Sequence, residues 1–130
     1  GGLGVIGHLP ERDGIYIGLL IAEIIVKRQK PLSELVKELE NEFGKRYYKR
    51  IDHHITQKEK IAIMKRLKTT LKAVAGNSVR KVETIDGFKY YIENGWLLVR
   101  PSGTEPLIRY YAEAESVSKV DQMLRWAKGE

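Results

Sequence analysis

The stretch "LLVRPSGTEPLIRYYAEA" (97–114) consists of two apolar, strand-like runs joined by seven residues, "RPSGTEP". Runs of this composition on either side of a loop rich in glycine, proline and hydroxyl groups predict an antiparallel hairpin. Upstream, "VRKVETI" and "FKYYIE" flank Asp86-Gly87, a two-residue hairpin signal, and "ENG" turns into "WLLVR". Four successive strands with short connections predict an antiparallel sheet.

The segments around these hairpins predict one further strand and two helices. Residues 46–55, "RYYKRIDHHI", alternate as a strand does. Residues 56–75 form an amphipathic helical pattern that Thr56 can cap, and residues 116–129 form another that Ser116 can cap. The order β-α-β-β-β-β-α predicts an α+β fold, with an antiparallel four- to five-stranded sheet and its helices packed on one face.

Two further helices precede this pattern. The first covers 13–28 with Asp13 as its cap, and the second covers 32–43, after which Gly44 fits a C-cap. The first is apolar nearly all round, and such a helix is buried from several sides. We expect it to be the tail of a missing domain, and to pack on the following domain or on another copy of the chain. The opening Gly-Gly without Met suggests a processed chain or a piece of a longer one.

Charge is unevenly distributed along the 130 residues, whose net charge is +6. Residues 1–44 carry 5 basic and 7 acidic groups, a net of −2, whereas residues 45–130 carry 18 and 10, a net of +8. A basic second part fits an anionic partner, either nucleic acid or a small phosphorylated ligand. A solvated lysine-rich surface is the alternative.

Cysteine is absent, which excludes disulfides and thiolate metal sites and favours a reducing cytoplasm. We expect no signal peptide. The longest apolar run, 15–26, is interrupted by Glu23 and is too short to cross a bilayer, so no membrane association is expected.

The "RPSGTEP" loop combines groups that bind phosphate. Pro101 holds Arg100 in an extended conformation, at a fixed angle to the end of its strand. Gly103 allows backbone angles that point consecutive N–H groups into one concavity, a nest for an anion. Hydroxyl and guanidinium donors lie in the same hairpin, on Ser102, Thr104, Arg100 and Arg109. An ordinary polar turn between two surface arginines is the alternative.

The same residues carry a family resemblance. "RPSGTEPLIRYYAEA" resembles the phosphate-binding loop in the last domain of the α-D-phosphohexomutases, the phosphoglucomutase/phosphomannomutase family, and matches every fixed letter of R-P-S-G-T-E-P-x-x-R. The opening "GGLGVIGHLPERDGIY" resembles the stretch after the family's sugar-recognition loop, G-E-x-S-G-G. The resemblance implies that 1–45 is the helical C-terminal remnant of domain 3, and that 46–130 is the phosphate-binding domain 4, which has a TBP-like fold.

The resemblance also implies a mechanism. The family moves a phosphoryl group between the 1- and 6-oxygens of a hexose, using a phosphoserine in domain 1, a Mg²⁺ loop in domain 2 and a hexose 1,6-bisphosphate. Domain 4 binds the phosphate that does not react, through positions that match Arg100, Ser102, Gly103, Thr104 and Arg109. The serine loop T-A-S-H-N-P and the metal loop D-G-D-x-D-R do not occur here. No catalytic residue or metal ligand is therefore assigned, and the isolated chain is expected to be inactive.

Other residues stay open at this point. The resemblance places His8 and Arg12 near the substrate, although "ERDG" also fits a charge arrangement at a helix start. His53 and His54 are adjacent on a strand and so point to opposite faces, which disfavours a shared metal ion. The expected partners are a phosphosugar and the missing N-terminal domains. The alternative is a non-enzymatic module that binds nucleic acid on sheet tyrosines, although each Tyr-Tyr pair puts only one ring on each face.

Overall fold

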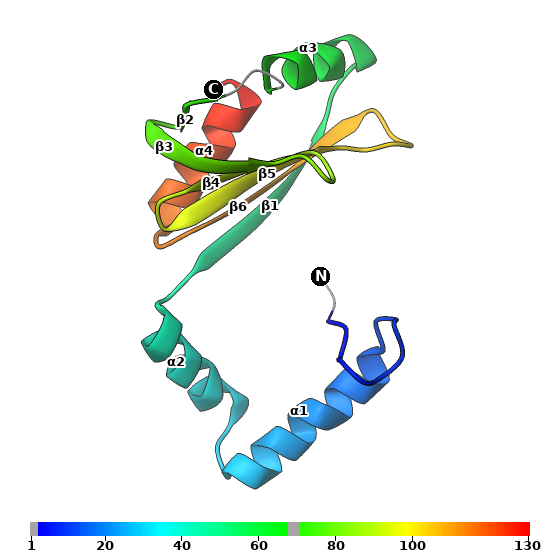
Figure 1. Ribbon diagram of the computed structural model, residues 1–130, viewed down its shortest axis with the longest axis vertical. Helices are drawn as coiled ribbons and strands as arrows, with labels where there is room; N and C mark the ends of the chain where they lie inside the picture. Colours follow the sequence, from blue (N-terminus) through cyan, green and yellow to red (C-terminus); the bar gives the residue numbers. More distant parts are fainter. Residues whose placement is uncertain (1–2, 68–70) are drawn as a thin grey trace. The chain divides into compact units, whose positions relative to one another are not determined.

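The computed structural model describes residues 3–67 and 71–130 (Figure 1). The contacts within the chain divide it into two compact units, Gly1–Gly44 and Lys45–Glu130. Each unit is described by itself. Among the described residues, no helix has the length and apolar character needed to span a membrane.

The first unit contains α1 (Gly14–Arg28) and α2 (Leu32–Phe43), as the sequence predicts. The Asp13 carboxylate caps α1 by accepting the Tyr16 N–H at 2.9 Å. None of the residues of α1 and α2, all of which are described, is buried. Large apolar side chains stay exposed on both helices, among them Ile15, Leu19, Val26, Leu39 and Phe43. This unit alone does not bury the apolar surface that the sequence presents.

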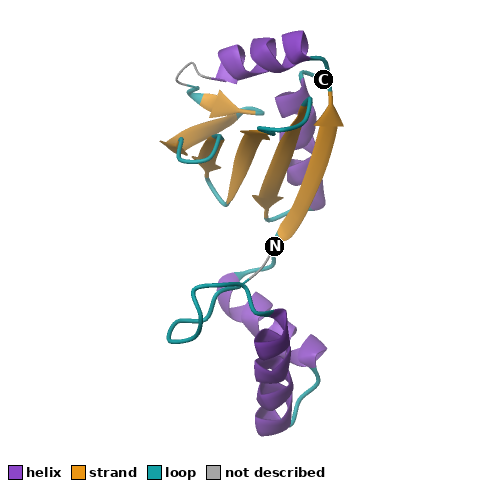
Figure 2. Ribbon diagram, turned by 90° about the vertical axis from the view of Figure 1, so that its right-hand side faces the viewer, coloured by secondary structure: helices purple, strands orange, loops and turns teal. Residues whose placement is uncertain are grey.

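The second unit is a six-stranded sheet with two helices, which confirms the α+β prediction, although four to five strands were predicted. Its elements are β1 (Tyr47–His54), α3 (Gln57–Leu67), β2 (Ala73–Val74), β3 (Asn77–Glu83), β4 (Phe88–Ile92), β5 (Gly95–Pro101), β6 (Leu107–Ala114) and α4 (Val117–Lys128). The strand order is β1-β6-β5-β4-β3-β2, and every neighbouring pair is antiparallel (Figure 1 and Figure 2).

The core lies between one face of this sheet and the helices, with α4 contacting chiefly β6 and β1. Tyr90 and Tyr110 are buried there, and their burial raises the pKa of each to about 12. The neighbouring Tyr91 and Tyr111 lie half-exposed on the other face. This confirms that each of these pairs places one ring on each side, because successive side chains of a strand alternate.

The predicted helix over 56–75 is too long. The described helix ends at Leu67, residues 68–70 lie outside the described part, and Ala73–Val74 forms β2. Ala75 and Gly76 both have positive φ and join β2 to β3 in a two-residue turn. Val74 is fully buried. An apolar residue inside the predicted helix thus reaches the core from a strand.

The connection at Asp86-Gly87 is also longer than the sequence predicts. The last pair before it joins Glu83 to Lys89, so residues 84–87 form a loop. Gly87 has φ +92, and a Cβ there would lie 2.3 Å from the Val99 carbonyl oxygen. The loop therefore approaches β5 more closely than a side chain would allow, which brings Asp86 to Arg100.

Candidate anion-binding site

Arg100 and Arg109 lie directly opposite each other, because β5 and β6 pair Arg100 with Arg109. Their neighbours Val99, Ile108 and Tyr110 are buried toward the helices, so both arginines leave the opposite face of the sheet. Side chains in such positions have Cβ atoms about 4.5–5.5 Å apart, and like charges there repel. The pair therefore requires compensating negative charge.

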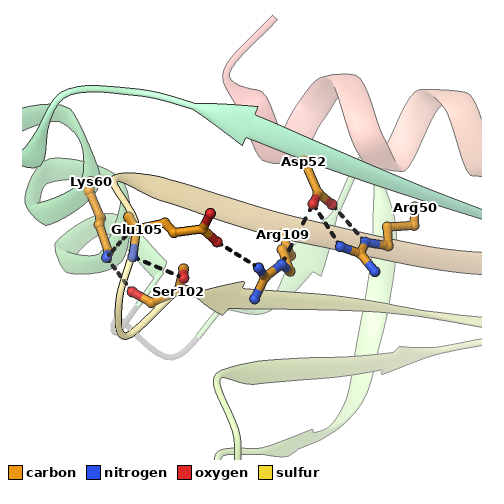
Figure 3. A network of polar contacts seen from close by, with 6 residues as sticks. All are labelled: Arg50, Asp52, Lys60, Ser102, Glu105 and Arg109. Carbon is orange, nitrogen blue, oxygen red and sulfur yellow. Dashed lines mark hydrogen bonds and ion pairs between the residues drawn. The ribbon is translucent and has the colours of Figure 1, made fainter. Parts of the chain in front are cut away.

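Three carboxylates supply that charge. Asp86, from the β3–β4 loop, lies 2.9 Å from Arg100 Nε. Glu105, within the β5–β6 loop, accepts a hydrogen bond from Arg109 Nη2 at 3.0 Å, and Asp52 on β1 lies 3.6 Å from Arg109 Nε (Figure 3). Asp52 is also the register partner of Arg109. One row across three strands thus carries Asp52, Arg109 and Arg100.

Asp52 is itself fixed by a second arginine. Arg50 donates two hydrogen bonds to its carboxylate, Nε to Oδ1 and Nη2 to Oδ2, each 2.6 Å long. These bonds, together with the positive charges of Arg50 and Arg109, lower the pKa of Asp52. Asp52 therefore remains an anion beside Arg109, whose side chain is only 24% exposed. Glu105 thus accepts a hydrogen bond from the Arg109 guanidinium, and Asp52 forms a longer ion pair with its Nε.

The β5–β6 loop is closed by its own hydrogen bonds. The Ser102 N–H donates to the Leu107 carbonyl at 3.0 Å, and Ser102 Oγ accepts the Glu105 N–H at 3.2 Å. Ser102 is 4% exposed. Because its oxygen accepts this bond, its hydroxyl proton remains able to donate. Gly103 and Thr104 lie on the exposed part of the loop, and the nest of backbone donors stays a prediction.

Gly103 does not use the conformational freedom predicted for it. It lies outside the left-handed region, and no described atom is within 4 Å of the place where a Cβ would sit. The missing side chain leaves the backbone at this position open from outside. Access to the amide, rather than an unusual φ, is what glycine provides here.

The sequence did not point to Lys60. Its Nζ donates to two carbonyls of the loop, Ser102 O at 2.5 Å and Glu105 O at 3.3 Å (Figure 3). The segment before α3 also binds the loop, because the Ile55 N–H donates to the Pro106 carbonyl at 3.0 Å. Thr56, the predicted cap of α3, forms a reciprocal capping box with Glu59. The start of α3 is therefore fixed against the loop.

The other two predicted contacts lie in the first unit. His8 Nε2 is 3.0 Å from Asp13 Oδ2, and the His8 ring stacks on Tyr16 with centroids 3.9 Å apart. Arg12 is exposed, and residues 4–12 line a shallow concave surface that includes both side chains. His8 is thus tied to the cap of α1. The loop residues come together in the second unit, and these two belong to the first.

Metal ligands are not gathered in the described residues, 3–67 and 71–130, where no three His, Cys, Asp or Glu side chains are placed to hold an ion. Of the two adjacent histidines, His53 is half-buried with its ring 6.1 Å from Tyr110, whereas His54 is exposed.

Comparison with known proteins gives matches along most of the chain. Residues 54–125 match the C-terminal domain of phosphoglucomutase/phosphomannomutase, and residues 1–43 match its alpha/beta/alpha domain III. A "Phosphoglucomutase/phosphomannomutase" of Thermococcus kodakarensis is 36% identical over 87% of this chain and 23% of its own length. A "Probable phosphoglucosamine mutase" of Methanosarcina acetivorans is 40% identical over 89% of this chain and 24% of its own.

A solved structure gives the same result. The crystal structure of a putative phosphomannomutase from Thermus thermophilus superimposes with a TM-score of 0.71 and 34% identity, over 99% of this chain and 24% of that protein. The chain thus spans about a quarter of the length of the relatives it matches. It belongs to the phosphoglucomutase/phosphomannomutase family and corresponds to the C-terminal part of that family's proteins.

Proposed function

We propose that this chain binds the non-reacting phosphate of a phosphosugar, as the C-terminal part of a phosphohexomutase that interconverts hexose 1-phosphate and 6-phosphate. The observation that carries this proposal is the register pair Arg100–Arg109, which flanks a loop with an accessible backbone and a donor hydroxyl. The phosphoserine that takes part in forming the hexose 1,6-bisphosphate lies in the missing N-terminal domains. This chain alone is inactive.

Each loop residue has a distinct part in the proposed site. The guanidinium groups of Arg100 and Arg109 each match two phosphate oxygens. The Ser102 hydroxyl and the Gly103 and Thr104 amides donate to the remaining oxygens. Because all contacts go to the phosphate and none to the ring, the sugar is free to bind in either orientation. Holding the substrate in this way lowers the entropic part of the barrier to phosphoryl transfer.

Mg²⁺ would supply charge stabilisation to phosphoryl transfer in the whole enzyme. The described residues of this chain offer no cluster that fits the ion. We therefore assign no step through Mg²⁺ to this chain. The exposed apolar residues of α1 are proposed as the surface that meets the missing domains or, in the isolated chain, a second copy.

Titration followed by ¹H–¹⁵N NMR tests the proposal. With inorganic phosphate or glucose 6-phosphate, we expect shift changes centred on 100–109 and a Kd near 1 mM, or about −4 kcal/mol, because the rest of the cleft is missing. Glucose, which lacks the phosphate, should cause no such changes. Shifts centred elsewhere, with an oligonucleotide perturbing Tyr91 and Tyr111, would favour a nucleic-acid module and overturn the proposal.

Asp86→Asn should tighten phosphate binding. In the unliganded protein the Asp86 carboxylate pairs with Arg100 at 2.9 Å, and both side chains are well exposed, at 64% and 43%. Phosphate must compete with this exposed ion pair, so its removal should lower Kd about two- to fivefold. The same NMR titration measures the effect. Asp121→Asn is the control. It breaks the ion pair between Asp121 on α4 and Lys49 on β1, removes an equal charge and should leave Kd unchanged. An unchanged or weaker affinity in Asp86→Asn would contradict the competition.

A further inference from the structure

We propose that Lys60 is a positioning residue for the phosphate-binding loop, an inference that rests on the function proposed above. Lys60 lies in the first turn of α3, 42 residues before Ser102 in the chain. It touches the loop only through backbone carbonyls among the described contacts. Its effect on phosphate is therefore exerted through the conformation and the electrostatic field of the loop.

The hydrogen bond from Lys60 to the Ser102 carbonyl orients a peptide group of the loop. The described peptide bonds are all trans, so the Ser102 carbonyl and the Gly103 N–H, which share one peptide plane, point in opposite directions. Lys60 binds that carbonyl at 2.5 Å. The Gly103 N–H therefore points away from the Lys60 ammonium, and Figure 3 shows Lys60 reaching the loop on the side away from Arg109.

The lysine can hold this orientation because its own position is fixed. The α3 capping box of Thr56 and Glu59 sets the start of the helix, with bonds of 2.8 Å and 3.3 Å between backbone and side chain. The Ile55–Pro106 hydrogen bond ties the same segment to the end of the loop. Three loop carbonyls, those of Ser102, Glu105 and Pro106, are thus bound by one short stretch of chain.

Lys60 also differs from the nearby arginines in charge balance. Arg50, Arg100 and Arg109 are each paired with a carboxylate. Lys60 donates to carbonyl oxygens, which are neutral, in the contacts that the structure describes. Its positive charge is therefore not cancelled locally and attracts an anion to the loop. Both effects, orientation and charge, favour phosphate without direct contact.

Lys60→Met is the first test, in the full 130-residue chain with inorganic phosphate as the probe. We expect Kd to rise roughly 10- to 100-fold, by analogy with the range seen when the hydrogen-bond partners of metal ligands are lost. Lys58→Met, on the same turn and exposed, removes an equal charge and should change Kd less than about twofold, since exposed charges are screened. If Kd rises equally in the two variants, Lys60 acts only as a general positive charge, and the positioning role is wrong.

Two measurements separate positioning from simple structural damage. Lys60→Arg keeps donors for the carbonyls and should restore Kd to within about threefold of the original protein. Without any phosphate, the Gly103 amide resonance should shift in Lys60→Met and stay near its original position in Lys58→Met. An unmoved Gly103 resonance, or failure of arginine to rescue binding, would refute the inference.

A third measurement uses the original chain alone, so it can be made even if the Lys60→Met protein does not fold. In the original chain the Lys60 ammonium should exchange its protons more slowly than those of the exposed Lys58 and Lys65, because it donates two hydrogen bonds. Equal exchange rates would contradict the contact itself. If the original chain binds no phosphate at 100–109 while this slow exchange is observed, the proposed function is wrong. The hydrogen bonds between Lys60 and the loop would still be confirmed.

Discussion

In the proposed full-length mutase, Arg109→Ala should lower kcat/KM by roughly 10- to 150-fold, which corresponds to a lost charge-assisted contact of about 1.5–3 kcal/mol. Arg109 is held between the carboxylates of Asp52 and Glu105, and only 24% of its side chain is exposed. A preorganised guanidinium loses little entropy when it binds phosphate. Steady-state kinetics with glucose 1-phosphate measure the effect.

A control variant tests whether the effect belongs to the site. Arg80 lies on β3 and forms an exposed pair with Glu93 at 2.7 Å. Arg80→Ala removes the same charge and should leave kcat/KM within about twofold, because exposed pairs contribute little. Arg109→Lys should recover only part of the loss, since an ammonium lacks the bidentate geometry. Unchanged kinetics in Arg109→Ala would remove this residue from the site.

Leu97→Ala should lower the free energy of unfolding of the second unit by about 2–5 kcal/mol. Leu97 is fully buried on β5, the third strand of the sheet, where it pairs with Tyr90 on β4 and Ala112 on β6. Its truncation leaves a cavity between the sheet and α4 that these neighbours cannot fill. Urea unfolding monitored by circular dichroism measures the change.

The next residue on the same strand provides a matched control. Leu98 points to the opposite face, where it is only partly buried and pairs with Lys89 and Tyr111. Leu98→Ala should cost less than about 1 kcal/mol, because less apolar surface leaves the protein interior. Equal losses at the two positions would mean that the assignment of the core to the Leu97 face is wrong.

Local signals in the sequence predicted much of the second unit. Ser116 and Thr56 cap their helices as expected, and strand alternation placed one ring of each Tyr-Tyr pair on each face of the sheet. Capping and alternation depend on residues a few positions apart, so a sequence reveals them directly. The predicted end of α3 was wrong because that prediction also relied on a local pattern alone. An apolar stripe does not show whether Val74 reaches the core from a helix or a strand.

The surroundings of the loop could not be predicted in this way. Asp86 meets Arg100 only because the β3–β4 loop is longer than a two-residue turn and bends over β5. Asp52 meets Arg109 through the register of β1 on β6, and Lys60 meets the loop through the direction in which α3 leaves β1. Each of these contacts is set by the pairing and packing of whole elements.

The sequence by itself determined the strand–loop–strand hairpin, the donors in "RPSGTEP" and the family to which they belong, because these lie within the single stretch 97–114. Only the tertiary structure decided which carboxylates pair with the arginines and which lysine binds the loop. Strand register and loop length set which carboxylate reaches each guanidinium, and the position of α3 sets which side of the loop Lys60 binds. Such contacts join residues that are far apart in the chain, and no pattern within one segment encodes them.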